Sequence, residues 1–423
     1  MQTTMSKQAF VGAAIGTMIE YYDLVLFAIF LPIISPLFFP AQSVYQSLVK
    51  GYFVLLIAMA VRPLGGLLFG YLGDVFGRRR ALLGSMYGIA LATILMGIVP
   101  THAMIGVWAA VIIVLAKSIQ MLCFGGEYNG AGIYVVEHAQ SNNEGFIGSL
   151  LTATTLFGAL MASLVGVLCT LKGMPVWSWR VAFLIGGIVG VFGILYRKNL
   201  LEAPNFKRAD LKLHSFKNMI KKYPQELTAG VMVGGFATVP FTTALTFINP
   251  ILMVKGHINS HELMLLQSLL ILMAILAIVV AGRVADKISP NKVMQFGAVL
   301  LVLVAYPLML LVDEKSLPLL ILAQALLIIV NEILLGPSNA YLKSLFAMEY
   351  RYRASSFSFC LGMSIIGGIT PLAENFLYRL TGEFSAVAIW LIVIGIGTLI
   401  SMKLVDKKRS LQTLLPGVYQ PWV

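Results

Sequence analysis

The sequence predicts an all-α membrane protein with twelve transmembrane helices, arranged as two pseudo-symmetric bundles of six. Three observations predict this fold. Of the 423 residues, 59% are hydrophobic and 11% are charged, so a soluble core of this size would have too few polar side chains to face water. The apolar residues gather in runs of about 20 or more, the length that crosses the hydrocarbon core of a bilayer as a helix. A polar signature in the first half of the chain also returns in the second half.

The twelve apolar runs are bounded by glycine, proline or charged residues. A helix satisfies its backbone hydrogen bonds internally, which makes it the element expected for each run in lipid. An even number of spans places both termini on the same side of the membrane. In chain order the runs are 10–38, 48–72, 80–99, 104–136, 147–171, 180–199, 226–253, 262–284, 292–312, 317–345, 353–380 and 384–405.

The loops indicate which side that is. Most of the 30 lysine and arginine residues fall in loops on the side of the termini, and the loops on the other side hold almost none. By the positive-inside rule this side faces the cytoplasm, which predicts a multi-pass protein of the bacterial inner membrane. The net charge of +12 then indicates contact with anionic lipid of the bilayer, and no nucleic-acid partner is needed. We expect a monomer.

The longest polar segment divides the spans six and six. We predict an amino-terminal six-helix bundle over residues 1–200, a cytoplasmic linker over 201–225, a carboxyl-terminal six-helix bundle over 226–406 and a cytoplasmic tail over 407–423. Leucine, phenylalanine, methionine and isoleucine among the linker lysines predict an amphipathic helix on the inner leaflet, and a disordered basic linker is the alternative.

The repeated signature follows the second span of each six. In the first half Gly70, Asp74 and Gly77 precede the run Arg78, Arg79 and Arg80, and in the second half Gly282 and Asp286 precede Ser-Pro-Asn-Lys. The two copies lie about half a chain length apart, as expected for two related halves.

These residues resemble the signature of the major facilitator superfamily, and the likeness extends to its metabolite:proton symporter family, whose members carry proline and betaine, citrate, α-ketoglutarate or shikimate. Lys117 stands where that family usually has an arginine. The resemblance implies the superfamily fold and transport without a cofactor other than the proton motive force. It is carried by "IGTMIEYYDLVLF" (15–27), "RPLGGLLFGYLGDVFGRRR" (62–80), "FGGEYNGA" (124–131), "VEHA" (136–139), "WRVAFLIG" (179–186), "YRKNLLEAPNF" (196–206), "RYRASS" (351–356) and "GGITPL" (367–372).

The first copy of the signature is expected to act as a cytoplasmic latch. The Asp74 carboxylate can cap the neighbouring helix and hold Arg78 or a nearby basic group across the two halves. Gly70 and Gly77 would permit a close helix approach and a tight turn. The alternative is that the arginines only fix the orientation of the loop. The candidate latch residues are Gly70, Asp74, Gly77, Arg78, Arg79, Arg80 and Asp286.

Charged residues within the spans point to the chemistry, because a charge in hydrocarbon is costly and usually faces a cavity or a partner. Both signs occur in the first half. Asp23, Glu127 and Glu20 are the candidates for proton coupling, and Arg62 and Lys117 are counter-ions or binders of a substrate carboxylate. Glu20 and Asp23 are three residues apart and are expected on one helix face. A static ion-pair network that only fixes helix packing is the alternative.

Further polar and aromatic residues are candidates for substrate binding. Aromatic rings can hold a quaternary ammonium group by cation–π attraction, and an amide can orient a carboxylate. Packing is the alternative role for each. These candidates are Tyr21, Tyr22, Tyr128 and Asn129 in the first half, and Thr243, Asn331, Glu332 and Glu374 in the second.

The function predicted from these features is proton-coupled import of a small charged or zwitterionic metabolite, a betaine, an amino acid or an organic acid, by alternating access. Proton-antiport export of a metabolite or drug is the alternative, because the fold alone does not set the direction. None of the five histidines belongs to an HExxH motif or to a pattern typical of a catalytic triad, so we expect neither an enzyme nor a metal site. The half-chain repeat disfavours a channel.

Overall fold

The computed structural model describes residues 7–140, 142–169, 171, 173–175, 177–197, 216–254, 258, 260–313 and 316–414. Within these residues the fold is helical and contains no strand. Twelve helical segments of the described chain are long and apolar enough to cross a membrane, and they correspond to the twelve runs of the sequence. The predicted fold class is therefore confirmed.

The first half supplies six spans and one short connecting helix. In chain order these are α1 (Lys7–Phe38), α2 (Val44–Phe76), α3 (Arg78–Ile98), α4 (His102–Ile105), α5 (Val107–His138), α6 (Glu144–Cys169) and α7 (Ser178–Arg197).

The second half begins after the polar segment and contains several interrupted spans. Its elements are α8 (Phe216–Lys222), α9 (Pro224–Phe236), α10 (Val239–Thr242), η1 (Thr243–Phe247), α11 (Ile248–Val254), α12 (Ser260–Lys287), α13 (Pro290–Asp313), α14 (Leu317–Leu335), α15 (Ser338–Leu345), α16 (Met348–Gly362), η2 (Met363–Gly367), α17 (Gly368–Thr381), η3 (Phe384–Val387) and α18 (Ala388–Leu414).

Most helices are apolar on every side, as expected for elements that face either lipid or other helices. Large apolar side chains such as Leu91, Phe192 and Leu276 are at least 65% exposed, while charged residues in the middle of spans, such as Asp23, Arg62 and Lys117, are buried. The exposed apolar surface is therefore the surface that lipid would cover, and the polar chemistry lies inside.

Two spans of the second half are interrupted close to proline and glycine residues. Span seven is interrupted before Pro240 and continues as the π-helical segment η1, and span eleven passes through a second π-helical segment, η2, just before Gly368 and Pro371. Proline and glycine weaken the regular helix at these points. Single-turn π segments within α-helices are frequent at functional sites.

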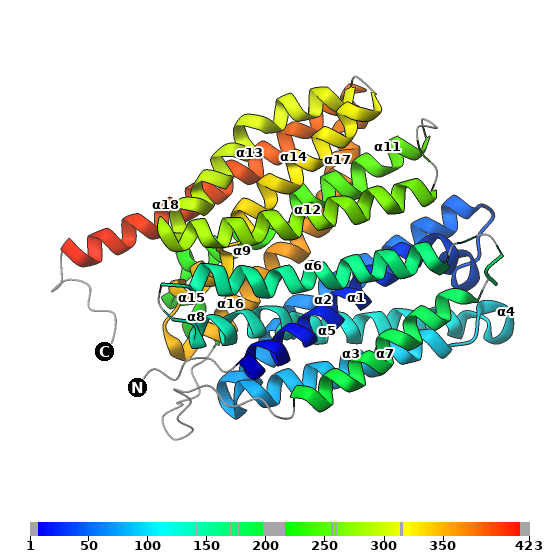
Figure 1. Ribbon diagram of the computed structural model, residues 1–423, viewed down its shortest axis with the longest axis horizontal. Helices are drawn as coiled ribbons and strands as arrows, with labels where there is room; N and C mark the ends of the chain where they lie inside the picture. Colours follow the sequence, from blue (N-terminus) through cyan, green and yellow to red (C-terminus); the bar gives the residue numbers. More distant parts are fainter. Residues whose placement is uncertain are drawn as a thin grey trace.

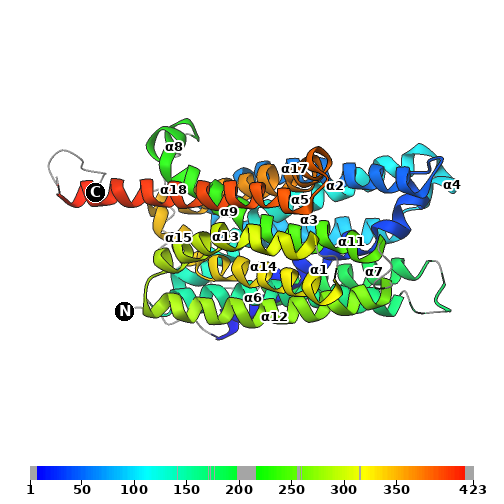
Figure 2. The same cartoon turned by 90° about the horizontal axis from the view of Figure 1, so that it is seen from above.

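The two halves lie side by side with their helices nearly parallel. Figure 1 shows α1–α7 in the lower part of the view and α12–α14, α17 and α18 in the upper part. The described chain begins and ends at the same end of the bundle, and α4 lies at the other end (Figure 2). We call these ends the termini side and the opposite side.

One pair of helices joins the halves over much of their length. α6 packs against α12, and glycines allow the close approach near the termini side, where Gly145 and Gly282 face each other. Further along, Ser163 Oγ lies 3.1 Å from Ser268 Oγ. The contacts between α6 and α12 therefore form a seam between the two halves.

The linker and the tail are only partly described. α8 is helical and buries Met219, and the Phe216 ring lies 5.2 Å from that of Phe357, edge to face. The remainder of the predicted amphipathic segment lies outside the described residues, as do residues 415–423 of the tail. α18 continues beyond the predicted end of its span, to Leu414.

Candidate functional site

A buried polar cluster joins three helices of the first half. Asp23 of α1 accepts a hydrogen bond from Thr93 of α3, with 2.7 Å between Oγ1 and Oδ2. Gln120 of α5 donates its Nε2 to the same Thr93 oxygen at 2.8 Å and accepts a 2.6 Å hydrogen bond from Lys117 Nζ. Asp23 and Lys117 are thus the two ends of one chain of hydrogen bonds.

The cluster is completely closed to solvent. Asp23, Thr93, Lys117 and Gln120 are each 0% exposed. The Lys117 ammonium lies 4.8 Å from the centre of the Phe27 ring, which adds a cation–π contact. Burying a carboxylate and an ammonium together costs far less than burying either alone. The two charges are therefore interdependent, and a change in one alters the energy of the other.

Arg62 and Glu20 form a second cluster, nearer to the second half. Arg62 of α2 is 0% exposed and Glu20 is 1% exposed, and the two charges interact with each other and with Tyr21. The guanidinium lies 6.0 Å from the Phe124 ring centre and also faces Cys360 of α16, in the other half. Arg62 therefore marks the contact between halves.

The structure separates Glu20 from Asp23, which the sequence places on one face. Asp23 faces α3, α5 and Gly186 of α7, whereas Glu20 faces α2. Residues three apart on a helix differ by about 60° in direction, enough in a tight bundle to reach different neighbours.

The remaining first-half candidates divide into two groups. Tyr22 turns away from the second half, since its hydroxyl donates to the carbonyl of Ala182 on α7 at 3.1 Å. Glu127, Tyr128 and Asn129 belong to helix α5, but their side chains lie outside what the structure describes.

In the second half two candidate residues meet at the interruption of span seven, and two others contact each other on α14. Thr243 of η1 donates to Glu374 of α17 at 2.5 Å. Asn331 donates to its neighbour Glu332 at 3.2 Å on α14, and all four side chains are buried. Gln324, which the sequence argument overlooked, donates 2.7 Å hydrogen bonds to the Ala244 carbonyl and to Asn249.

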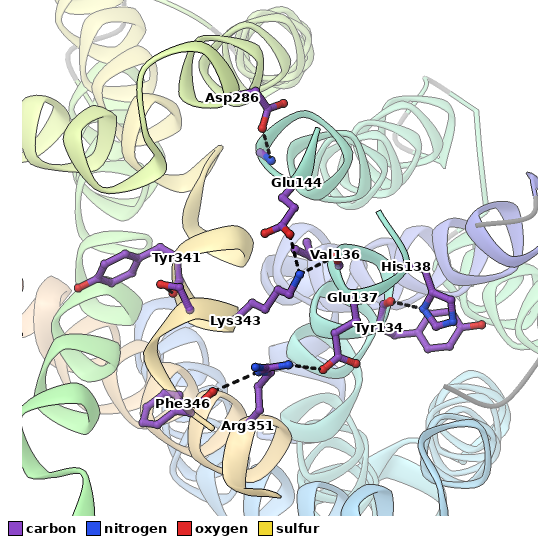
Figure 3. A network of polar contacts seen from close by, with 12 residues as sticks. Tyr134, Val136, Glu137, His138, Glu144, Asp286, Tyr341, Lys343, Phe346 and Arg351 are labelled. Carbon is purple, nitrogen blue, oxygen red and sulfur yellow. Dashed lines mark hydrogen bonds and ion pairs between the residues drawn. The ribbon is translucent and has the colours of Figure 1, made fainter. Parts of the chain in front are cut away.

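On the termini side, polar contacts hold the two halves together (Figure 3). Lys343 of α15 pairs with Glu144 of α6 at 2.7 Å, and Arg351 of α16 pairs with Glu137 of α5 at 2.9 Å. The Asp286 carboxylate accepts the backbone N–H groups of Gly145 and Phe146 at 2.7 and 2.8 Å, at the amino-terminal end of α6. An anion is stabilised at that end of a helix. The termini side is therefore closed.

The predicted latch residues contribute to this closure in part. Asp286 bridges the halves as described, although it belongs to the second copy of the signature. Gly77 has a φ of 100° and ends α2, which supports the predicted tight turn. The side chains of Asp74 and Arg78 lie outside the described residues, while Arg79 is half-buried and Arg80 exposed.

Gly70 permits the close helix approach that the sequence predicts. A Cβ atom at this position would lie 2.9 Å from the Cα atom of Arg353 in the other half. We expect Gly70→Ala to open the termini side, because backbone cannot move aside as a flexible side chain can. The readout is alkylation of Cys360, which is 0% exposed, in a background where Cys123 and Cys169 are replaced by alanine. The alkylation rate should rise about tenfold, the effect of roughly 1.4 kcal/mol on the closed state.

Gly84→Ala is the matched control for this test. An added Cβ at Gly84 lies 3.8 Å from its nearest neighbour, an ordinary contact within the first half. Its labelling rate should equal that of the parent. Equal rates for Gly70→Ala and Gly84→Ala would contradict the role given to Gly70.

The fold and the site define a class: a multi-pass membrane transporter whose two six-helix halves enclose buried charges and close on one side. Comparison with known proteins supports this class. A family model described as "Sugar (and other) transporter" matches residues 9–213, and one described as "Major Facilitator Superfamily" matches residues 231–418. The chain belongs to the major facilitator superfamily, and it is a transporter rather than an enzyme.

Relatives and solved structures extend this picture. A putative proline/betaine transporter of Staphylococcus haemolyticus is 30% identical over 405 residues, which cover 92% of this chain and 86% of that protein. The proline/betaine transporter of Escherichia coli is 26% identical, over 93% and 82% of the two chains. A proton:xylose symporter structure aligns with a TM-score of 0.75 at 15% identity, covering 95% of each chain. The fucose:proton symporter of Escherichia coli aligns with a TM-score of 0.70 at 13% identity, covering 94% and 98%.

Proposed function

We propose that this protein imports a small zwitterion such as proline or a betaine across the bacterial cytoplasmic membrane, driven by the proton gradient. The observation that carries the proposal is the buried chain from Asp23 through Thr93 and Gln120 to Lys117. The names of the relatives support the substrate class, and the symporter fold supports proton coupling.

The hydrogen bonds of Thr93 support a proton on Asp23. A hydroxyl has one hydrogen and can accept two. Thr93 Oγ1 lies within reach of two acceptors, Asp23 at 2.7 Å and the Ile89 carbonyl at 2.9 Å, and it accepts from Gln120. All of these contacts are satisfied at once when Asp23 is protonated and donates to Thr93, while Thr93 donates to Ile89.

Protonation would couple to the substrate through Lys117. With Asp23 ionised, the ammonium group is electrostatically paired with it inside the first half. A proton on Asp23 removes that charge and leaves Lys117 as a buried cation that needs a counter-ion. The carboxylate of an incoming zwitterion can supply this counter-ion, so proton and substrate favour each other's binding, as symport requires.

Alternating access follows from the closed termini side. The basic loops support a cytoplasmic position for this side. The structure then corresponds to a state closed to the cytoplasm, and inward release requires the breaking of the Lys343–Glu144 and Arg351–Glu137 pairs. Rocking about the α6–α12 seam would exchange this closure for one on the opposite side.

Uptake by proteoliposomes tests the proposal. Purified protein is reconstituted, an inward proton gradient is imposed, and radiolabelled L-proline, glycine betaine and representative organic acids are supplied outside. We expect gradient-dependent accumulation of a zwitterion. Accumulation that persists after a protonophore collapses the gradient would rule out symport, and gradient-driven efflux of preloaded substrate would favour the antiport alternative.

Lys117→Met should separate recognition of the carboxylate from the rest of transport. Loss of a charge-assisted hydrogen bond costs about 1.5–3 kcal/mol, so the KM for glycine betaine should rise about tenfold or more. Choline, which lacks the carboxylate, should inhibit the variant and the parent equally. An unchanged ratio of betaine to choline affinity in Lys117→Met would exclude this role. Lys117→Arg keeps the charge and is the matched control.

A further inference from the structure

Glu374 is a buried carboxyl group for which the transport scheme above has no use. It lies on α17, three residues after Pro371, and is 0% exposed. Its Oε1 atom contacts Thr243 Oγ1 at 2.5 Å, and its Oε2 atom has no hydrogen-bond partner among the described residues. Thr243 begins η1, the π-helical segment of span seven.

The hydrogen atoms available at Thr243 favour a protonated Glu374. The threonine hydroxyl has a single hydrogen, and it faces two acceptors, Glu374 and the Val239 carbonyl at 2.9 Å. A neutral Glu374 can donate to Thr243 while Thr243 donates to Val239, which satisfies both contacts. An ionised Glu374 would have one donor at most, and its second oxygen would remain buried without any.

No charge among the described residues balances an ionised Glu374. The elements packed against α17 include α10, η1, η2, η3 and α18; among their described residues Thr243 donates to Glu374, and Trp390 of α18 donates to Thr370 of α17. Tyr378 stacks on Phe384, and Arg379 and Glu383 are exposed at the opposite side. Asp313 is occupied by the backbone N–H groups of Phe384 and Ser385, and the charges of α18 begin at Lys403, on the termini side.

The energetic consequence is large. An isolated carboxylate is strongly destabilised when it leaves water without a counter-ion, and in practice such a group holds a proton instead. Asp23 has Lys117 in its surroundings, whereas Glu374 has no comparable cation in the described structure.

We propose that Glu374 is a second proton-binding site, located in the half of the protein that lacks Asp23. The inference rests on the proposed proton coupling and extends it. In both sites a carboxyl group contacts a threonine whose hydroxyl also contacts the carbonyl four residues earlier: Asp23 with Thr93, and Glu374 with Thr243. Each half thus contains a buried carboxyl group that is held by a threonine in this way.

Release of this second proton requires movement between α17 and η1. Both spans are interrupted next to the site, by η1 in span seven and by η2 in span eleven. A shift of α17 that separates Glu374 from Thr243 and admits water would remove the burial that favours the neutral form. The bound substrate is thus accompanied by one proton from each half.

The test compares Glu374→Gln with the parent in two measurements. The first is the infrared carbonyl band of protonated carboxyl groups in the purified protein, recorded as the pH is raised. We expect Glu374→Gln to lack one component of this band that the parent retains at neutral pH, and Thr243→Val to shift that component.

The second measurement is the proton-to-substrate ratio in proteoliposomes. It is obtained from the imposed pH gradient at which a known substrate gradient gives no net transport. The ratio should fall by about one proton per substrate.

Controls keep the outcomes distinct. Glu383→Gln changes an exposed carboxylate near the same helix, and it should alter neither the band nor the ratio. Thr243→Ser retains the hydroxyl and should restore the band position of the parent. If Glu374→Gln is inactive in transport, the infrared comparison alone decides. An unchanged band and an unchanged ratio overturn the second site while leaving the proposed symport intact, whereas loss of proton dependence in the parent overturns the symport itself.

Discussion

We expect Asp23→Asn to abolish the uphill accumulation of substrate but to leave the exchange of substrate across the membrane. Asparagine has nearly the same size as aspartate, and its side-chain NH2 group can donate to Thr93 as the hydroxyl of a protonated Asp23 would. It can neither bind nor release a proton. The cluster is then fixed in a form that resembles protonated Asp23, with Lys117 available to the substrate.

The expected size of this effect follows from the imposed gradient. Without coupling the substrate only equilibrates, so accumulation should fall to the level seen without a gradient, about tenfold for one pH unit and one proton per substrate. Counterflow, in which labelled substrate enters vesicles preloaded with unlabelled substrate, needs no proton movement and should continue. The two measurements on the same vesicles separate a loss of coupling from a loss of folding.

Asp23→Glu and Glu383→Gln complete this experiment. Asp23→Glu keeps an ionisable group but lengthens the side chain in a fully buried site that also faces Gly186, so partial coupling is expected. Glu383→Gln removes an exposed carboxylate and should transport like the parent. If Asp23→Asn still concentrates substrate under a proton gradient, the coupling proton resides elsewhere and the role of Asp23 is structural.

The sequence predicts the fold well because the signal is repeated along the chain. Twelve apolar runs and two copies of one loop signature each indicate the same architecture, and the structure has the twelve helices. Within the site, Asp23, Lys117 and Arg62 can be chosen from sequence because a charge inside an apolar run is rare and costly. Their burial in the structure agrees with that argument.

The partners of these charges could not be predicted in the same way. Thr93 is an ordinary threonine in an apolar run, and only the packing of α3 against α5 makes it the link between Asp23 and Gln120. Gln120 lies one turn after Lys117, so its spacing offered a signal that was overlooked. Tyr22 was chosen for its proximity to the charges, but its direction around α1 takes it to α7.

The two ion pairs that join the halves on the termini side were not among the residues predicted from the sequence, for a physical reason. Charges at the ends of spans also serve to orient loops, so Glu137, Glu144, Lys343 and Arg351 look in the sequence like residues that only set topology. Their pairing depends on how the two halves meet, which no pattern within one half can reveal. Asp286 could be found because it belongs to the repeated signature.

Reversal of the charge at Glu137 should open the termini side and slow uptake about tenfold. Glu137→Arg would place a second guanidinium beside that of Arg351, with which Glu137 now forms a 2.9 Å ion pair. Arg351 also donates to the Phe346 carbonyl at 3.2 Å, so it cannot turn away without losing that hydrogen bond. Like charges that face each other across an interface cost several kcal/mol. The protein should therefore favour the state open to the cytoplasm and bind external substrate poorly.

The same change at the neighbouring pair should have a smaller effect, because solvent weakens it. The Glu137 side chain is 9% exposed and that of Arg351 is 20% exposed, whereas Glu144 and Lys343 are 25% and 21% exposed. Exposed ion pairs contribute about 0–1 kcal/mol, and the contribution grows as water is excluded. Glu137→Arg should therefore lower the initial uptake rate, and raise the rate of Cys360 alkylation, more than Glu144→Lys does.

The double exchange Glu137→Arg with Arg351→Glu decides whether the pair itself holds the side closed. It restores opposite charges at the same two positions, so both the uptake rate and the low Cys360 alkylation of the parent should return in large part. The loss of the Arg351 hydrogen bond to Phe346 limits the recovery. A double variant as defective as Glu137→Arg alone would show that this ion pair does not hold the side closed. The energy of closure would then lie in the contacts that glycines of α2 and α5 make with the second half, and in the Asp286 cap of α6.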